Sequence, residues 1–183
     1  MTSLLRLEGA TLRRGGRLLF QDLNVSLEAG DALQVTGPNG SGKSSLLRLT
    51  AGLLRPEAGI VERAPLALAD DNLALDRELP LQEALRFWCQ STNEVLEALG
   101  LVHLAIVPVR LLSSGQAKRA ALARVAASGA PLWLLDEPLN ALDSDGADRL
   151  ARIIAKHRAA GGAVLSASHQ TLPGEWRILE LGR

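Results

Sequence analysis

The stretch GPNGSGKS, residues Gly37 to Ser44, constrains the fold of this chain more than any other part of its sequence. It matches the pattern GxxxxGK[ST] in full. It stands between an apolar segment, ALQVT (32–36), and a segment with helical spacing, SSLLRLTAGLL (44–54). Glycines let the backbone curl so that successive N–H groups face phosphate oxygens, and Lys43 adds a compact positive charge. The sequence therefore predicts a strand, a phosphate loop and a helix in succession, and so an α/β fold.

A plain glycine-rich turn before a helix is the alternative interpretation of this stretch. The adjacent strand, together with Lys43 and Ser44 at the required positions, favours phosphate binding. The hydroxyl of Ser44 is expected to bind Mg²⁺, and the ligand is expected to carry a triphosphate. The predicted nucleotide-binding residues are Gly37, Pro38, Asn39, Gly40, Ser41, Gly42, Lys43, Ser44 and Ser45.

The rest of the chain alternates between predicted strands and helices. The first thirty residues show the apolar–polar alternation of antiparallel strands. Buried strands are expected in PLWLLDEP (131–138) and AVLSAS (163–168), with helices between them, which is typical of a largely parallel sheet covered on both faces. We find no internal repeat or linker. We therefore expect a single domain, residues 1–183, with an N-terminal antiparallel β subdomain, a mostly parallel core sheet and an inserted α-helical subdomain at about 73–128.

Two carboxylates follow the apolar run LWLL. Asp136 and Glu137 are predicted to emerge at the carboxyl end of a buried strand, the edge where open α/β sheets bind ligands. Asp136 is expected to hold Mg²⁺, directly or through water, and Glu137 to orient and deprotonate an attacking water. Two exposed acids at a strand end, without a role, are the alternative interpretation. The phosphate loop upstream favours the catalytic one.

His169 ends the predicted strand AVLSAS and is expected on the same edge of the sheet. A histidine after a strand is by itself more often structural. Here a donor is needed near the γ-phosphate, and this position can supply one. The predicted catalytic residues are Glu137, His169 and Lys43.

LSSGQ, residues 112–116, precedes a second helical run. The start of a helix presents N–H groups to an anion, so Ser113, Ser114, Gly115 and Gln116 form a second candidate phosphate site. An ordinary serine N-cap is the alternative interpretation.

Taken together, GPNGSGKS, LSSGQ, LWLLDEP, NALD (140–143) and SHQ (168–170) occur in an order and spacing that resembles the ATP-binding cassette ATPases, over nearly the whole chain. The resemblance implies a P-loop ATPase fold and a homodimer. It also implies that LSSGQ is the signature loop, which caps the γ-phosphate of ATP bound to the other subunit.

Longer stretches, such as GGAVLSASHQTL, look like the ATPases of haem exporters in bacterial cytochrome c maturation. That branch implies membrane permease subunits of the CcmB and CcmC type as partners. It also implies a peripheral location on the cytoplasmic face of the inner membrane.

The chain departs from that family in two places. Cassettes usually stack adenine on an aromatic residue of the first strands; here Phe20, or the planar group of Arg13 or Arg14, is the available substitute. Most members also carry a metal-site glutamine after the strand that corresponds to LALAD, where this chain offers only Asn72. We expect poor discrimination between ATP and GTP, and Asn72 is a candidate for a metal role through water. Phe87 and Trp88 are expected in the core, or else against a membrane partner.

Charge and hydropathy restrict the remaining functions. Twenty basic and twenty acidic residues cancel, so the composition indicates no nucleic-acid partner. No uncharged run approaches the roughly 18 residues of a membrane span. Two other readings stay open: a cassette that works on ribosomes or DNA, which usually needs tandem cassettes or a long insert, and a regulatory nucleotide-binding module with little turnover.

Overall fold

The computed structural model describes residues 3–89 and 91–182. Its elements are β1 (Ser3–Arg14), β2 (Arg17–Glu28), β3 (Ala32–Thr36), α1 (Lys43–Thr50), β4 (Ala58–Arg63), β5 (Leu66–Ala69), α2 (Leu81–Arg86), α3 (Asn93–Ala98), the 3-10 turns η1 (Val102–Leu104) and η2 (Val109–Leu111), α4 (Ser114–Ala127), β6 (Leu132–Asp136), α5 (Ser144–Ala159), β7 (Ala163–Ala167) and β8 (Arg177–Glu180).

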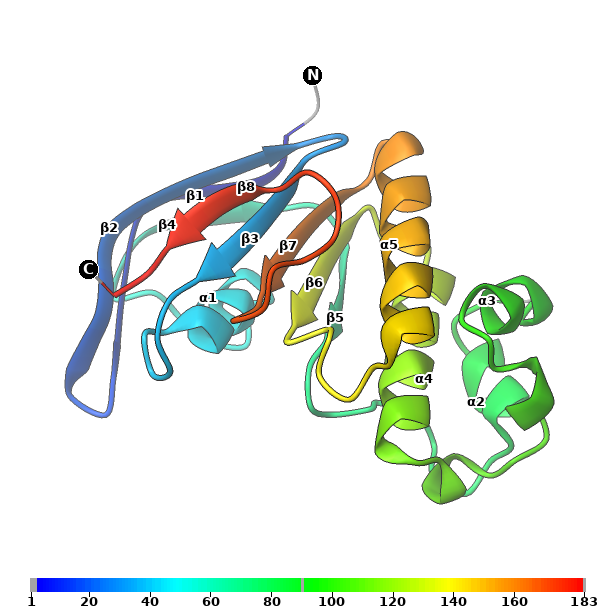
Figure 1. Ribbon diagram of the computed structural model, residues 1–183. Helices are drawn as coiled ribbons and strands as arrows, with labels where there is room; N and C mark the ends of the chain where they lie inside the picture. Colours follow the sequence, from blue (N-terminus) through cyan, green and yellow to red (C-terminus); the bar gives the residue numbers. More distant parts are fainter. Residues whose placement is uncertain (1–2, 90, 183) are drawn as a thin grey trace.

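Two sheets form the body of the molecule (Figure 1). β2, β1 and β4 form an antiparallel sheet in that order, while β5, β6, β7, β3 and β8 form a parallel one. β6 and β7 are buried along their whole length. That burial explains why their sequences are continuous apolar runs rather than alternating ones. The predicted parallel core sheet and antiparallel N-terminal strands are confirmed.

Apolar side chains cover both faces of the parallel sheet. One core lies between the two sheets and α1, with Leu46 and Leu47 fully buried in it. The other joins β5 and β6 to α4, α5 and the short helices α2 and α3, which stand beside the sheet (Figure 1). Because helices and a second sheet cover its faces, the parallel sheet is left open to ligands at its strand ends.

The helix α5 has an apolar face that packs against the sheet. Leu150, Ile153 and Ile154 are buried, and the half-buried ring of His157 stacks on Trp133 of β6 with centroids 3.8 Å apart. The capping carboxylate of Asp143 accepts a hydrogen bond from the Gly146 N–H at 2.8 Å. These contacts fix α5 against the sheet.

The expectation that Phe87 is a core residue is wrong. Its side chain is 84% exposed and only its edge meets Trp88. Trp88 is half-buried and lies under the guanidinium of Arg124, 5.0 Å from the ring centroid. α2 ends at Arg86, so Phe87 lies beyond the turn that faces the core.

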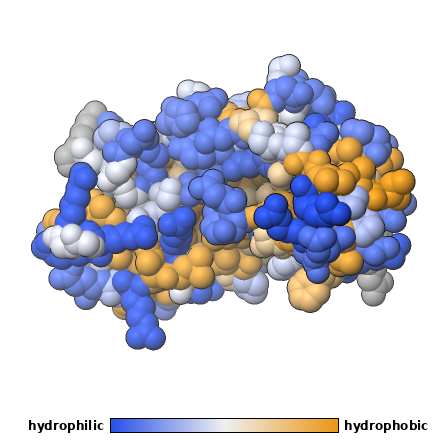
Figure 2. Space-filling model, turned by 90° about the horizontal axis from the view of Figure 1, so that it is seen from below, coloured by the Kyte–Doolittle hydropathy of each residue, from blue (hydrophilic) through white to orange (hydrophobic). Residues whose placement is uncertain are grey.

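Figure 2 shows the molecule from below Figure 1, and apolar surface gathers at the end where the short helices lie. The exposed large apolar residues of this segment are Leu79, Phe87, Val102, Ile106 and Leu111.

Candidate functional site

The phosphate loop joins β3 to α1, as the motif predicts. Gly42 precedes the helix with φ of 104°, and no side chain among the described residues caps its first N–H groups. A helix start without a cap leaves these donors for an anion. Gly37 has φ of 137°, and a Cβ there would lie 2.2 Å from the carbonyl oxygen of Leu181. The loop therefore needs glycine at these positions for backbone shape and for close packing.

Lys43 is the first residue of α1 and is almost fully buried. Its Nζ donates hydrogen bonds to the carbonyl oxygens of Gly37 at 2.8 Å and Pro38 at 3.3 Å. These weak neutral partners keep the ammonium inside the loop. A phosphate oxygen is a stronger partner because a charge-assisted hydrogen bond exceeds a neutral one.

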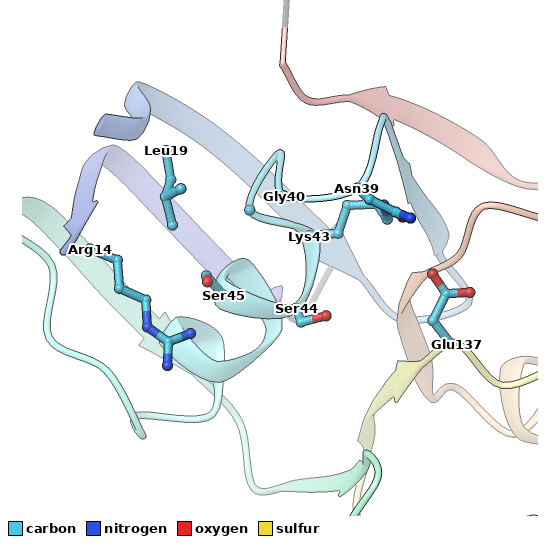
Figure 3. A pocket seen from close by; sticks show the side chains of 9 residues that line it. Arg14, Leu19, Asn39, Gly40, Lys43, Ser44, Ser45 and Glu137 are labelled. Atoms are coloured by element: carbon cyan, nitrogen blue, oxygen red, sulfur yellow. The ribbon is translucent and has the colours of Figure 1, made fainter. Parts of the chain in front are cut away.

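A cleft of about 340 Å³ opens over the loop (Figure 3). Figure 3 shows Glu137 on one side of the phosphate loop and Arg14 with Leu19 on the other. Of the predicted nucleotide residues, Gly37, Pro38 and Ser41 are not among those that line it. The residues that line the cleft are Arg14, Leu19, Asn39, Gly40, Gly42, Lys43, Ser44, Ser45 and Glu137.

Ser44 and Asp136 meet beside this cleft although they are far apart in the sequence. The hydroxyl of Ser44 donates to Oδ1 of Asp136 at 3.0 Å. Burial raises the pKa of the Asp136 carboxyl above its ordinary value, while the Ser44 hydrogen bond opposes that rise. A hydroxyl and a carboxylate are hard oxygen ligands of the kind that hold Mg²⁺ together with substrate phosphates. The residues present therefore fit this metal.

Glu137 and His169 form a pair at the ends of β6 and β7. His169 Nδ1 lies 2.8 Å from Oε2 of Glu137. Glu137 adopts φ of 44°, an unusual backbone conformation for a side-chain-bearing residue. Its N–H donates to the Ala167 carbonyl at 2.8 Å, which holds that conformation. Strain of this kind gathers at functional sites, and here it turns the carboxylate toward the cleft, which Glu137 lines.

The LSSGQ segment begins α4 as expected, and Ser113 is its N-cap. Ser113 Oγ accepts from the Gln116 N–H at 3.3 Å, and Gln116 Oε1 accepts from the Ser113 N–H at 2.8 Å. A second cleft, of about 250 Å³, is lined by Ser113, Gly115, Gln116, Arg119, Ala141, Leu142 and Asp143. It shares no lining residue with the cleft over the phosphate loop. The two predicted phosphate sites are thus separate within one chain.

Known proteins share this combination of features. The model of the ABC transporter family matches residues 20–140. The cytochrome c biogenesis ATP-binding export protein CcmA of Sphingopyxis alaskensis is 54% identical over 180 residues, which cover 94% of this chain and 93% of that protein. The chain belongs to the ABC transporter family, as a CcmA-type ATPase.

Further similarities agree with this family. The CcmA protein of Novosphingobium aromaticivorans is 57% identical over 163 residues, covering 87% of this chain and 85% of that protein. A solved ATP-binding cassette, a dimer in a post-hydrolysis state bound to ADP and phosphate, superposes with a TM-score of 0.84 at 23% identity, over 97% of this chain and 94% of that one. At that identity the likeness shows a shared fold. Members of this ABC family bind ATP, and hydrolysis coupled to export is the expected activity.

The structure separates the three candidates for a nucleobase partner in this CcmA-type cassette. Phe20 is 7% exposed and belongs to the core, so the proposal that it replaces the adenine-stacking aromatic is wrong. Arg13 forms an ion pair with Glu57 at 3.2 Å. Arg14 lines the cleft, and so does Leu19, which sequence reasoning missed. Leu19 follows the Gly15–Gly16 turn closely, and that hairpin position is the signal that could have found it.

Asn72 does not line the cleft over the phosphate loop. It is exposed, and its backbone N–H donates to Oδ1 of Asp70 at 2.9 Å. After the larger effect of burial, the negative charges of Asp71 and Glu137 also raise the pKa of Asp136. The acidic doublet that directly follows β5 was the available sequence signal for Asp71.

Lys118 of α4 is a second residue that sequence reasoning missed. Its Nζ donates to the backbone oxygen of Asp136 at 3.0 Å. Burial lowers the pKa of this ammonium, and the charges of Asp71, Asp136 and Glu137 oppose that effect. Lys118 thus ties the helix that begins at LSSGQ to the strand end that carries the acidic pair.

In residues 3–89 and 91–182 we find no helix that is both long enough and apolar enough to cross a membrane.

Proposed function

We propose that this chain is the ATP-hydrolysing subunit of an export complex that serves cytochrome c biogenesis, the process named in its relatives. Two copies pack head to tail and enclose two ATP molecules. One observation carries this proposal: the cleft lined by the phosphate loop and Glu137 contains no residue of the chain's own LSSGQ segment.

Three side chains in or beside the cleft have roles in the proposed reaction. Lys43 exchanges its loop carbonyls for oxygens at the β/γ end of the triphosphate. Glu137 accepts a proton from the attacking water, a step that positioned general bases accelerate by about 10²–10⁴. When both ring nitrogens of His169 carry protons, Nδ1 donates to the Glu137 carboxylate across the 2.8 Å contact and Nε2 is a donor toward the γ-phosphate.

Ser44 and Asp136 are the proposed Mg²⁺ ligands, and Asn72 is kept as a more distant candidate that acts through water. When bound, Mg²⁺ neutralises charge on the phosphate oxygens. The chain's own contribution is the 3.0 Å pairing that sets hydroxyl and carboxylate side by side before the nucleotide arrives.

The signature loop is proposed to complete the site of the second copy. Ser113 and Ser114 are exposed at the start of α4. Gly115 is packed so tightly that a Cβ would lie 2.6 Å from the Ala141 carbonyl oxygen. The Ser113 hydroxyl uses its lone pair for the cap and keeps its proton to donate to a γ-phosphate. Gln116 holds the loop in that shape.

The proposed partners beyond the second copy are membrane permease subunits of the CcmB and CcmC type, with haem as the cargo and the cytoplasmic face of the bacterial inner membrane as the location. The names of the relatives and the apolar surface over the short helices support a membrane complex. No nucleic-acid partner is proposed, because the net charge is zero.

Arg14 and Leu19 are proposed as the platform for the nucleobase. Both line the cleft on the side away from Glu137 (Figure 3). An apolar side chain and a planar cation contact the face of a purine without reading its edge. ATP and GTP should therefore bind with dissociation constants within about tenfold, a factor worth 1.4 kcal/mol. Titration of Glu137→Gln protein with each nucleotide measures this, and a larger preference for ATP would refute the platform.

The function is tested by the ATP hydrolysis rate as a function of protein concentration. A head-to-tail dimer gives a specific rate that rises steeply with concentration and is lost in Glu137→Gln. A low-turnover regulatory module, the second candidate because the aromatic platform and metal-site glutamine are replaced, gives a flat, slow rate in both proteins. Co-purification with the permease subunits then tests the membrane complex.

A further inference from the structure

The segment 168–176 crosses the parallel sheet without a helix. It leaves β7 and enters β8, and the sheet order β7, β3, β8 places β3 between these two strands (Figure 1). A crossover in a parallel sheet normally has a helix to satisfy its own backbone groups. An irregular segment over a buried strand needs partners for its N–H and C=O groups from elsewhere.

Gln34 of β3 supplies two of these partners from beneath. Its Nε2 donates to the Gln170 carbonyl at 2.7 Å, and its Oε1 accepts from the Leu172 N–H at 3.2 Å. Gln34 is 2% exposed, in a strand whose neighbouring positions are apolar. A buried amide in such a strand is costly unless it is fully hydrogen-bonded, and here donor and acceptor are both used.

His169 lies directly before the residue that Gln34 holds. Its side chain is 53% exposed, so packing around the ring does not fix it. The backbone on either side of His169 fixes its position. The Ser168 N–H donates to the Val35 carbonyl oxygen at 3.1 Å, and the Gln170 carbonyl oxygen accepts from Gln34 Nε2. His169 therefore stands between two anchors on β3, the strand that leads into the phosphate loop.

We propose that Gln34 is a positioning residue for ATP hydrolysis, which keeps His169 against Glu137 by clamping the segment after β7. The inference rests on the proposed function, because it assigns a consequence to the Glu137–His169 contact. It predicts that loss of the clamp lowers kcat and leaves the KM for ATP unchanged. A misplacement of about 1 Å costs up to about a hundredfold in rate.

The test compares three variants of the full chain. Gln34→Leu removes both hydrogen bonds, and Gln34→Glu keeps the acceptor for Leu172 but loses the donor to Gln170. Ser166→Ala is the matched control: Ser166 is fully buried, pairs with Gln34 in the sheet and bonds to Leu135, away from the clamped segment. For each, kcat and KM are measured together with hydrogen exchange at the Leu172 amide.

The expected result for Gln34→Leu is a kcat lowered by roughly ten- to a hundredfold, an unchanged KM, and faster exchange at Leu172. Gln34→Glu should keep the Leu172 amide protected from exchange and still have a lower kcat. This variant decides the question if Gln34→Leu does not fold. Ser166→Ala should leave kcat, KM and exchange at Leu172 unchanged. Full kcat in a Gln34→Glu protein, or equal losses in Ser166→Ala, would overturn the proposal.

Failure of the proposed function is visible separately. If Glu137→Gln hydrolyses ATP like the unsubstituted chain, the catalytic assignment is wrong. Exchange at Leu172 still shows in that case whether Gln34 clamps the segment.

Discussion

The two helix starts that the sequence marks as phosphate sites are built in opposite ways. α1 begins after Gly42 without a side-chain cap, and a buried ammonium and a buried carboxylate lie beside it. α4 begins with a complete capping box between Ser113 and Gln116. The first N–H groups of α1 are therefore left for a ligand. At the start of α4, the Gln116 N–H is already bonded to the side chain of Ser113.

This difference agrees with the proposal that the start of α1 binds nucleotide within its own chain and the start of α4 acts on the nucleotide of the other copy. Free donors and buried charges near α1 cost stability until a phosphate and a metal satisfy them. The capped start of α4 is stable as it stands and offers only short, exposed side chains. In the proposed function, the first region binds the nucleotide, and the second covers a nucleotide that is already bound to another copy.

The largest expected effect is a loss of ATP affinity on substitution of Lys43 but not of Lys118, the two lysines near the end of β6. Lys43→Met should raise the dissociation constant for ATP by roughly ten- to a hundredfold, because a charge-assisted hydrogen bond contributes about 1.5–3 kcal/mol. Lys118→Met is the control, since Lys118 bonds to the Asp136 backbone and does not line that cleft. Calorimetric titration in a Glu137→Gln background measures both. Equal losses of affinity would erase the distinction between the two regions.

A second prediction concerns the cap of α4. Ser113→Asp keeps a good N-cap but places a negative charge where a partner's γ-phosphate would lie. We expect it to fold normally, bind ATP normally and lose concentration-dependent hydrolysis. Gln116→Ala breaks the capping box without adding charge and should mainly cost stability, about 1 kcal/mol by analogy with cap loss. Unimpaired hydrolysis by Ser113→Asp would contradict a role for this loop in the reaction.

Stability should respond with opposite signs in the two regions. Asp136→Asn removes a buried carboxylate and should raise the Tm of nucleotide-free protein in a chelator, with about 2–4 °C for each kcal/mol gained. Ser113→Ala removes a cap and should lower it. With Mg²⁺ and ATP present, the Tm of Asp136→Asn should fall below that of the unsubstituted chain, because bound ligand stabilises only a protein whose site can bind it. A lower Tm for Asp136→Asn in chelator would mean that the buried carboxylate of Asp136 does not destabilise the nucleotide-free protein.

The smallest expected effect lies at His157, which lines neither cleft. Burial lowers the pKa of His157 below its ordinary 6.5. The unfolded chain therefore takes up this proton first as the pH falls through 6.5, and stability is lost toward the lower folded pKa. His157→Phe keeps a ring against Trp133 and should remove that part of the pH dependence. Thermal unfolding between pH 5 and 8 measures it; ATP affinity measured alongside should not differ between the two proteins.

Much of the nucleotide cleft could be predicted from sequence because its parts are contiguous. The phosphate loop is a single stretch whose glycines have one backbone use, and Asp136 and Glu137 stand next to an apolar strand that fixes their edge of the sheet. The contact between Ser44 and Asp136 follows once both elements are placed. These inferences needed only local pattern and the geometry of parallel strands.

The remaining features depend on packing between distant segments. Phe20 and Phe87 have the same side chain, yet one is buried and the other exposed, since Phe20 packs in the core between the two sheets and α1, whereas Phe87 follows the last turn of α2. Gln34 reads as an interruption of an apolar strand until the segment 168–176 is seen to cross it. No local pattern reports such contacts.

The central claim, that each copy completes the other's site, is tested most directly by mixing two inactive variants. Glu137→Gln lacks the general base, and Ser113→Asp carries a damaged signature loop; each alone should hydrolyse ATP slowly. In a mixed dimer, the intact Glu137 of one copy faces the intact Ser113 of the other, so hydrolysis should return upon mixing. If the mixture stays as inactive as its components while mixed dimers form, LSSGQ serves its own chain and the account is wrong.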